Sequence, residues 1–484
     1  MQSPKLILSF TPVALLIVLL SLNVYIFGDN ALGGANQIVL VFVAALASVL
    51  ARIAGISWTQ IQAGIVRSIA VSLPAVLILL MVGALSGTWL LGGVVPAMIY
   101  YGLFILDPSI FLAAACVVSA VVSISTGSSW TTSATVGIAL MGIGITLGFN
   151  PAMVAGAILS GAYFGDKLSP LSDTTNLAAG VVGTDLFTHI RYMLVTTGPS
   201  ITIALIVFLL LGIGSYDNTA EVEDIKVALV STFNINGVLL LAPIAVIVMI
   251  VKKIPALPAL FIGTLIGAVL GLIFQAPLIA ELALQQGQTT LPTYAVILTA
   301  FFGDTNIITG SEVLDELLSA GGMSGMLNTI WLILCAMIFG GVMEVSGFLR
   351  AITKAIIRQV HSRAQLFAAT VSTCMFTNVS ASDQYLSIIV PGQMYKDAYK
   401  DRGLAPQNLS RTLEDSGTVT SVLVPWNTCG AFHAGVLGVA TLSYAPFAIF
   451  CYLSPVMTLA FAFTGYKIVK TQSGVEGATP VIKE

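Results

Sequence analysis

Carboxylate side chains stand beside hydroxyl and amide side chains at several points of an otherwise apolar sequence. The run Asp173–Asn176 places one charged oxygen donor and three neutral ones within four residues. Asp304–Asn306 has a similar composition at the end of an apolar segment. Oxygen ligands of this kind suit hard cations such as Na⁺. A carboxyl group that binds a cation when ionised and releases it when protonated makes the cation and the proton compete for one site.

Ser- and Thr-rich segments interrupt the apolar sequence twice, and each is followed by a polar segment that contains an Asp. The four segments are Ser123–Ser133, Gly165–Asn176, Thr377–Asp383 and Glu414–Ser421. Asp166 is followed at the third and sixth positions by Ser169 and Ser172, and Asp415 in the same way by Thr418 and Ser421. This duplication predicts two related halves, residues 1–214 and 237–467, with an acidic linker at 215–236 and a tail at 468–484.

We interpret the Ser- and Thr-rich segments as breaks in helices. Backbone groups released from a helix cannot face lipid, so they must line a cavity or be buried in protein. Released carbonyls can hold a cation, and half-helix N-termini favour an anionic group. The alternative is that Ser and Thr bond back to the preceding turn or join neighbouring helices. The density of hydroxyl groups around Gly127, together with the duplication, favours the breaks.

The composition requires a lipid-facing surface. Hydrophobic residues make up 57% of the 484 residues and charged residues 8%, with a mean hydropathy of +0.98, whereas soluble domains carry about 25% charged residues. The apolar residues come in helix-length blocks and not in alternation, which argues against a β-barrel. The prediction is an all-α membrane protein with about 11–14 membrane segments. The continuous candidates are Leu6–Phe27, Gln37–Leu50, Val71–Leu91, Ser109–Ser123, Tyr192–Gly214, Val238–Val251, Ala256–Phe274, Leu327–Gly347 and Ser443–Tyr466.

The distribution of basic residues predicts the orientation. Three linkers are basic: Arg52 to Arg67, Lys252 to Lys253, and Arg350 to Arg363. The linker Tyr216–Lys226 is acidic, and Gln275–Leu291 has no basic residue. The positive-inside rule places the basic linkers and both termini in the cytoplasm. With both termini on one side and an odd number of crossings in each half, the two repeats would be inverted.

Carboxyl groups within membrane segments are costly and mark functional or tightly paired sites. The proton-coupling candidates are, in order of preference, Asp173, Asp166, Asp415 and Glu344. For Asp166, the alternative is a structural salt bridge to the adjacent Lys167. Asp107 and Asp185 fall in expected loops, where helix capping or solvation is the better interpretation. His433 lies in a candidate core segment, and packing is preferred there to pH sensing.

At these residues the sequence resembles the NhaC-type Na⁺/H⁺ antiporter family, a branch of the ion transporter superfamily, over most of the chain. The motifs that carry the resemblance are Gly161–Asn176, Phe339–Leu349, Asn378–Gln384 and Val424–Gly430. The resemblance implies a multi-pass inner-membrane transporter with paired helical hairpins, inverted repeats and alternating access, assembled as a homodimer. It also implies that Thr126–Ser129 contacts Asp173–Asn176, and that Asn378–Asp383 contacts Asp415–Ser421.

The resemblance and the residue chemistry together define a candidate ion-binding set. Its members are Thr126, Ser128, Ser129, Asp166, Ser169, Asp173, Thr174, Thr175, Asn176, Asn378, Ser380, Asp383, Asp415, Thr418 and Asn427. Within it, Na⁺ is expected at Asp173, Thr175, Asn176 and Thr126. The partners expected are Na⁺, H⁺ and the lipid bilayer, with no cofactor beyond the transported Na⁺ and no nucleic acid.

The main alternative is a Na⁺- or H⁺-coupled exchanger of small carboxylates or amino acids, such as malate for lactate. A substrate carboxylate needs a basic or amide group, for which Lys167 and Asn427 are the candidates. The sequence shows no obvious buried Arg, and this favours exchange of ions alone. An intramembrane enzyme is disfavoured, because the aspartyl-protease pattern is missing and the serine-protease match at Gly322–Gly325 is a four-residue chance match in a Gly-rich linker. An ATP-driven pump is disfavoured because no phosphate loop occurs.

Overall fold

The chain is described here from a computed structural model. The structure describes residues 4–27, 31, 33–105, 107–213, 219–285, 287, 290–309, 315 and 318–471. The predicted tail beyond residue 471 and the start of the predicted acidic linker, residues 214–218, lie outside this described part. Part of the remaining linker is helical, because α11 spans Thr219–Thr232.

Nearly every ordered segment is helical. The first elements are α1 (Leu6–Phe27), α2 (Ala35–Ile53), α3 (Trp58–Leu91), α4 (Val94–Ile105), η2 (Pro108–Ile110), α5 (Phe111–Thr126), α6 (Ser129–Thr132), η3 (Ser133–Gly137), α7 (Ile138–Thr146), α8 (Pro151–Leu168), α9 (Asp173–Val182) and α10 (Leu186–Gly212). After α11 come η4 (Gly237–Leu240), α12 (Leu241–Val251), α13 (Ala256–Phe274), α14 (Ala276–Gln285), α15 (Pro292–Phe302), α17 (Gly322–Gly325), α18 (Leu327–Val345) and α19 (Phe348–Ile357). The last elements are α20 (Arg363–Ser380), α21 (Gln384–Asp401), α22 (Pro406–Leu413), η5 (Glu414–Thr418), η6 (Ser421–Leu423), α23 (Thr428–Leu437), α24 (Thr441–Tyr444), η7 (Ala445–Phe447) and α25 (Ile449–Thr464). Two short strands, β1 (Thr305–Asn306) and β2 (Ser319–Ala320), pair antiparallel.

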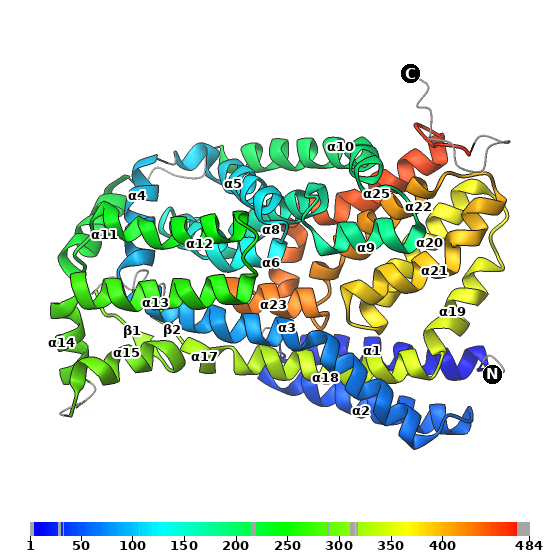
Figure 1. Cartoon of the computed structure of the whole chain (residues 1–484), viewed down its shortest axis with the longest axis horizontal. Coiled ribbons are helices and arrows are strands. Elements are labelled where there is room, and N and C mark those ends of the chain that lie inside the picture. Colours follow the sequence, from blue (N-terminus) through cyan, green and yellow to red (C-terminus); the bar gives the residue numbers. More distant parts are fainter. Residues whose placement is uncertain are drawn as a thin grey trace.

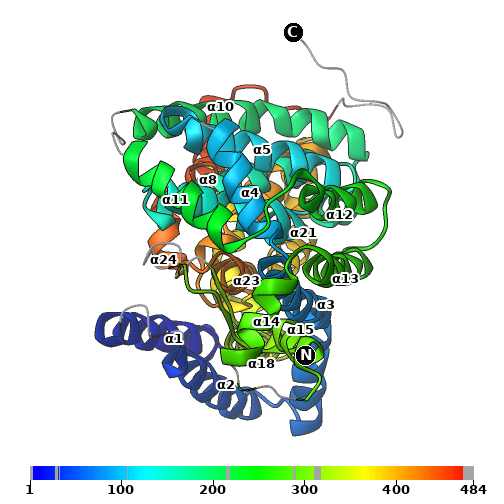
Figure 2. The same ribbon diagram turned by 90° about the vertical axis from the view of Figure 1, so that its left-hand side faces the viewer.

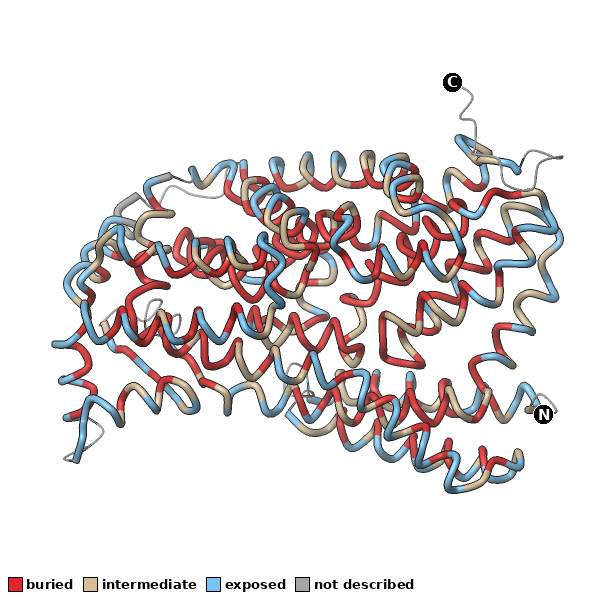
Figure 3. The backbone as a smooth tube through the Cα atoms, in the orientation of Figure 1, coloured by how far each residue is buried: buried red, intermediate tan, exposed pale blue. Residues whose placement is uncertain are grey.

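The prediction of an all-α polytopic membrane protein is confirmed. Within the described ranges, seven helices are long and apolar enough to cross a membrane, and nine if each of two bent pairs is counted as one span. The predicted 11–14 segments also counted interrupted stretches, which the structure shows as hairpins and broken helices. Many large apolar residues of the long helices are exposed, whereas the residues around the breaks are mostly buried (Figure 3).

The helices form two layers (Figures 1 and 2). One layer contains α1, α2, α3 and α18, which pack on one another along their lengths. The other layer contains α5, α8, α10 and the C-terminal helices α20–α25. The two hairpin tips and the π-helical turns η3 and η5 lie among the elements of this second layer.

Two helical hairpins enter the second layer from opposite ends of the molecule (Figure 1). In the first hairpin, α5 runs to a tip at Gly127–Ser128 and α6, η3 and α7 return, so that the ring of Phe111 lies 5.3 Å from that of Phe149. In the second hairpin, α20 and α21 meet at a tip around Ser382, and Thr373 Oγ1 lies 2.9 Å from Tyr395 Oη between its arms.

The two halves share one register. Elements of the second half start 255 residues after their counterparts: Pro406 after Pro151, and Thr428 after Asp173. The left-handed glycines that end α9 and α23 obey the same offset, Gly438 after Gly183. Because the two hairpins enter from opposite ends of the molecule (Figure 1), the repeats have opposite orientations.

This register corrects the pairing predicted from Ser and Thr spacing. With an offset of 255, Asp166 corresponds to Ser421 and not to Asp415. The prediction matched the two halves by residue type. The structure matches them by the positions of their hairpin tips and helix breaks, at an offset of 255 residues. Asp415 therefore lies at a different position in its half from Asp166.

Candidate functional site

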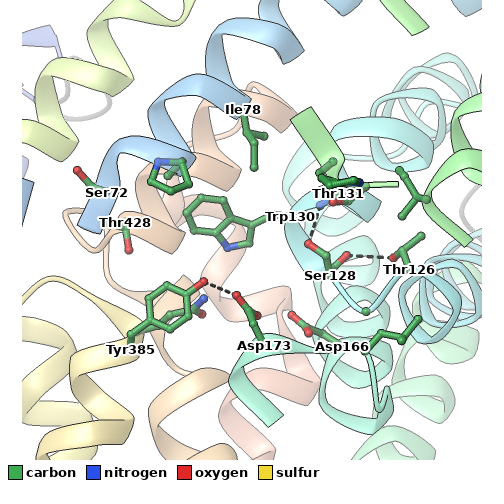
Figure 4. Close-up of a pocket in the computed structure, with 18 of the residues that line it drawn as sticks. Ser72, Ile78, Thr126, Ser128, Trp130, Thr131, Asp166, Asp173, Tyr385 and Thr428 are labelled. Carbon is green, nitrogen blue, oxygen red and sulfur yellow. Dashed lines mark hydrogen bonds between the residues drawn. The ribbon is translucent and has the colours of Figure 1, made fainter. Parts of the chain in front are cut away.

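A cavity of about 440 Å³ lies where the hairpin tips and helix breaks meet the first layer (Figure 4). Its walls come from the middle of α3, both hairpin tips, the start of α9, and the loop between α12 and α13. The residues that line it are Val71, Ser72, Pro74, Ala75, Ile78, Thr126, Gly127, Ser128, Trp130, Thr131, Asp166, Leu171, Asp173, Ile250, Lys253, Ile254, Pro255, Ala256, Asp383, Gln384, Tyr385 and Thr428. We call this cavity the central pocket.

The first hairpin tip needs a glycine to approach the break between α8 and α9. Gly127 ends α5 with a φ of 70°, a left-handed conformation that glycine adopts without strain. A Cβ atom at this position would lie 2.6 Å from the Cβ of Leu171. Any residue other than glycine would therefore displace Leu171. The next residue, Ser128, caps α6 by accepting a hydrogen bond from the backbone N–H of Thr131 at 3.2 Å.

Asp166 joins α8 to this hairpin. Its Oδ2 atom accepts hydrogen bonds from the backbone N–H and the hydroxyl of Ser129, at 3.0 and 2.7 Å. Its Oδ1 atom has no hydrogen-bond partner among the described residues. The carboxyl group is therefore held firmly from one side and left with a free oxygen at the wall of the central pocket.

Asp173 joins the two halves. It starts α9, where the helix dipole favours a negative charge. Its Oδ2 atom accepts a hydrogen bond of 2.5 Å from the hydroxyl of Tyr385, which belongs to the second hairpin. Figure 4 shows these two side chains pointing toward each other across the pocket.

The second hairpin tip mirrors the first. Asp383 caps α21 by accepting from the backbone N–H of Leu386 at 2.9 Å, in the position that Ser128 has in the first half. Asn378 donates to the Gly417 carbonyl at 2.7 Å, and Asn427 donates to the Asn378 carbonyl at 3.1 Å. The structure thus brings the arm of this hairpin against the segment around Gly417 that the resemblance indicated.

The predicted site residues divide into two groups. Those that line the pocket are Thr126, Ser128, Asp166, Asp173 and Asp383. Three others brace the break between α8 and α9 through backbone carbonyls: Ser169 to Ile124, Thr175 to Lys167, and Asn176 to Pro170 and Ser172. Ser380 bonds back to the Phe376 carbonyl in its own helix. Thr174 lies 3.1 Å from the Ser172 hydroxyl. Of the four residues proposed to hold Na⁺, the pocket thus gathers Thr126 and Asp173, whereas Thr175 and Asn176 face the break.

The predicted alternative for Asp166, a salt bridge to Lys167, is wrong. The Lys167 ammonium forms a salt bridge with Asp415 and donates to the Ser454 hydroxyl at 3.0 Å. Asp415 also accepts from the hydroxyl groups of Thr196 and Thr458. Adjacent residues of a helix point about 100° apart, so Lys167 projects away from the Asp166 side and into the second half.

The expectation of no buried Arg is also wrong. Arg411, on α22, is completely buried beside Asp415, with its Nε atom 3.9 Å from Oδ2 of that residue. Its guanidinium lies over the ring of Tyr192, 4.5 Å from the centroid. The segment Gln407–Arg411 has the polar composition of a surface segment. For this reason the sequence did not predict that it is buried between α10, α20 and α21.

Several residues of the site were not predicted. Tyr385, Trp130, Gln384 and Thr428 line the pocket, and Tyr385 could have been suspected because it directly follows the motif Asn378–Gln384. Glu344 is half-buried and does not line the pocket, and Asp304 is exposed.

Other predicted roles outside the pocket can be compared with the structure. The rings of Trp130 and Phe432 stack at 4.2 Å, and His433 packs at the edge of this aromatic group. Of the two roles expected for Asp107 and Asp185, capping or solvation, the structure shows capping, of η2 and α10. Hydrogen bonds from Ser109 lower the pKa of Asp107, which lies outside the membrane segments.

The fold and the site define a class: broken helices of two inverted halves meet at a polar pocket within a helical membrane protein, which is the architecture of a secondary transporter and not of an enzyme. The chain belongs to the Na⁺/H⁺ antiporter family, whose model matches residues 161–466. It is 38% identical to the Na⁺/H⁺ antiporter NhaC of Alkalihalophilus pseudofirmus, covering 90% of this chain and 92% of that protein.

Other relatives of similar sequence identity are named for substrates other than Na⁺ and H⁺ alone. The malate-2H⁺/Na⁺-lactate antiporter of Bacillus subtilis is 39% identical, covering 87% of each chain. The arginine/ornithine antiporter ArcD of Halobacterium salinarum is 35% identical, covering 94% of this chain and 91% of that protein. Overall sequence identity therefore does not distinguish between these substrates, and the residues of the pocket must do so.

Proposed function

We propose that the protein exchanges Na⁺ for H⁺ across the bacterial inner membrane by alternating access. The single observation that carries this proposal is the charge of the central pocket. Three carboxyl groups, those of Asp166, Asp173 and Asp383, line it, and the basic residue among its lining residues is Lys253, from the loop between α12 and α13. Such a wall attracts cations and offers them hard oxygen ligands.

The proposed Na⁺ site lies between the first hairpin tip and the start of α9. Asp173 supplies a charged oxygen, and Thr126 and Ser128 add neutral oxygen atoms from the tip. The free Oδ1 atom of Asp166 faces the same space. A proton on Asp166 or Asp173 removes a negative charge that holds Na⁺, so Na⁺ and H⁺ compete for the site.

The two groups considered for a substrate carboxylate are already engaged. Lys167 is paired with Asp415, and Asn427 donates to Asn378 while accepting from the backbone of Cys429. A carboxylate entering the pocket would instead meet three groups of like charge. These contacts support exchange of ions alone over exchange of small carboxylates.

A second candidate is the exchange of a cationic amino acid. The pocket volume falls within the roughly 300–1,000 Å³ of small-ligand pockets. Trp130 adds an aromatic wall to the three carboxyl groups, a combination that binds ammonium and guanidinium groups. The arginine/ornithine antiporter among the relatives makes this chemistry the one to test beside Na⁺.

The experiment that tests the function measures proton flux in proteoliposomes when Na⁺ is added, with and without malate, lactate or arginine. Proton flux driven by Na⁺ without any organic solute establishes Na⁺/H⁺ exchange. Flux that needs arginine would establish the second candidate, and flux that needs malate or lactate would overturn both. No cofactor beyond the transported ions is part of the proposal, and a homodimer with both termini in the cytoplasm is its assembled form.

A further inference from the structure

A second cavity, apart from the central pocket, lies between α1, α19 and α20 and has a volume of about 820 Å³. Its lining is apolar except for the side chains of Thr11 and Gln359. The α1 residues along it are open to the outside, since Ile7 is 79% exposed and Val18 is 62% exposed. We call this cavity, formed by one side of α1, one side of α19 and Phe376 of α20, the apolar groove.

The apolar groove lies alongside the lipid bilayer. Its first wall, α1, is one of the helices that are long and apolar enough to cross a membrane, and the groove follows this helix from Leu6 to Val18. Apolar cavities in proteins stay dry, and hydrocarbon is the solvent around a membrane-spanning helix. The lining of the groove therefore matches a hydrocarbon chain and does not match water.

The outer side of α19 differs from the side that lines the groove. Ile352 and Ile356, four residues apart, lie on the groove side. Arg350, Lys354 and Arg358 are exposed and recur at the same spacing, so they form a basic stripe on the other side of the helix. A helix with one apolar side and one side rich in Lys and Arg lies at the boundary between headgroups and acyl chains. The stripe is thus expected at the headgroups and the groove at acyl-chain depth.

The three walls of the groove carry basic residues and no acidic ones. Residues 4–27 and 346–380, which contain these walls, include no Asp or Glu. The Lys and Arg residues of these segments are Lys5, Arg350, Lys354, Arg358 and Arg363. None of them forms an ion pair with any residue that the structure describes. A cluster of unpaired positive charges beside the end of a membrane helix attracts anionic headgroups.

We propose that an anionic phospholipid binds the apolar groove, with one acyl chain between α1 and α20 and its phosphate at the basic stripe of α19. The lipid then joins α1, in the first layer, to α20, which is an arm of the second hairpin. The other occupant to consider is a second copy of this chain. In a twofold dimer both copies present the same surface, so their positive charges would meet with no acidic residue on these walls to pair them. The charge therefore favours the lipid.

Lipid titration of the purified protein in detergent, followed by native mass spectrometry, tests this site. The probes are phosphatidylglycerol and phosphatidylcholine with identical acyl chains, and glycerol 3-phosphate as a headgroup without chains. The wild type should bind phosphatidylglycerol most tightly and glycerol 3-phosphate not at all. Lys354→Gln/Arg358→Gln should weaken phosphatidylglycerol binding about 25-fold, at about fivefold for each basic residue, and leave phosphatidylcholine binding unchanged. The charge-matched control Arg67→Gln/Lys252→Gln, at exposed residues away from the groove, should bind like the wild type.

Ala355→Trp tests the acyl-chain part of the site, because it fills the groove without changing its charge. This variant should weaken the binding of both lipids, and if it fails to fold, the double variant at exposed positions still decides. The inference is overturned if the wild type binds both lipids equally or binds glycerol 3-phosphate as tightly as phosphatidylglycerol. It is also overturned if the preference for phosphatidylglycerol survives Lys354→Gln/Arg358→Gln, or if the control loses it as well. Dissociation of a dimer by Ala355→Trp with unchanged lipid binding would make the groove a subunit interface instead.

Discussion

At the scale of single residues, the site depends on carboxyl groups that are held by partners from distant parts of the chain. The hydrogen bond from Tyr385 to Asp173 connects the second hairpin to the first half across 212 residues. Asp166 is fixed instead by Ser129 from its own half. Asp166 is therefore held within one half, whereas Asp173 is held between the two halves. Relative movement of the halves would change the hydrogen bond of Asp173 and leave that of Asp166 intact.

Tyr385→Phe removes the hydroxyl group that orients Asp173. A hydrogen bond to a charged group contributes about 1.5–3 kcal/mol, and at roughly tenfold per 1.4 kcal/mol we expect the apparent KM for Na⁺ to rise by about ten- to a hundredfold. The measurement is Na⁺-driven proton flux in proteoliposomes at a series of Na⁺ concentrations. Tyr294→Phe, at an exposed tyrosine of α15, is the control, and an unchanged KM in Tyr385→Phe would show that this hydrogen bond does not form the Na⁺ site.

Asp415→Asn tests the buried ion pair. The substitution leaves Lys167 and Arg411 buried without their counter-charge, and breaking a buried pair in this way costs about 3–5 kcal/mol. We expect a clear loss of thermal stability in detergent, larger than for Lys167→Met, which still leaves Arg411 beside Asp415. Equal stability of Asp415→Asn and wild type would mean that Asp415 is not the counter-charge of Lys167 and Arg411.

At the scale of elements, α5 and α8 approach so closely that glycine is required between them. A Cβ atom at Gly161 would lie 2.0 Å from the Cys116 carbonyl oxygen, and one at Gly165 would lie 2.4 Å from that of Ala120. Small residues permit such contact in membrane helices. The consequence for function is that α8 carries Asp166 directly against the first hairpin.

Gly161→Ala should therefore separate α5 from α8. We expect a lower unfolding temperature and a weaker Na⁺ affinity, because Asp166 would move away from Ser129. Gly180→Ala is the matched control, since a Cβ atom there meets nothing within 4 Å. Thermal unfolding followed by tryptophan fluorescence distinguishes the two, and equal behaviour of both variants would contradict the packing described.

The sequence predicts those features of the elements that depend on neighbouring residues, and misses those that depend on contacts between distant segments. The span Leu6–Phe27, the breaks at Gly127 and Ser172, and the capping role of Asp185 follow from apolar length and local residue types. The contacts of Lys167 with Asp415 and of Tyr385 with Asp173 do not, because they join segments more than 200 residues apart. These pairings are fixed by the inverted packing of the halves.

The same reasoning explains the two wrong predictions about charge. Lys167 follows Asp166 in sequence, but neighbours on a helix point in different directions, and the partner of Lys167 lies in the other half. Arg411 stands in a segment of polar composition, and only the tertiary arrangement shows that other helices cover it. Burial of a polar segment in a membrane protein is not visible in hydropathy.

At the scale of the whole molecule, the ends of the elements separate into two faces. One face gathers the start of α1, the turn between α19 and α20, and the segment after α25: Pro4 approaches Gly347, Arg402 donates to the Val360 carbonyl, and Leu404 pairs with Lys470. The opposite face carries α14 and α15 (Figure 1). The basic linkers of α2–α3 and α19–α20 end at the first face, which supports its cytoplasmic placement.

Labelling from one side of the membrane tests this orientation. His361→Cys places a thiol on the predicted cytoplasmic face, and Gln285→Cys places one on the opposite face; both positions are exposed. The five native cysteines are buried, so the background should be low. An impermeant maleimide added to intact cells should label Gln285→Cys and spare His361→Cys, and the reverse pattern would place the termini outside.

The central claim is that Na⁺ and H⁺ compete for the acidic pocket between the halves. The most direct test is equilibrium binding of radioactive Na⁺ to the purified protein, measured across pH for wild type, Asp173→Asn and the control Asp185→Asn. We predict saturable binding that weakens as protons are added in wild type and in the control, and no saturable binding in Asp173→Asn although it remains folded. Wild-type binding in Asp173→Asn, or wild-type binding that ignores pH, would contradict the account.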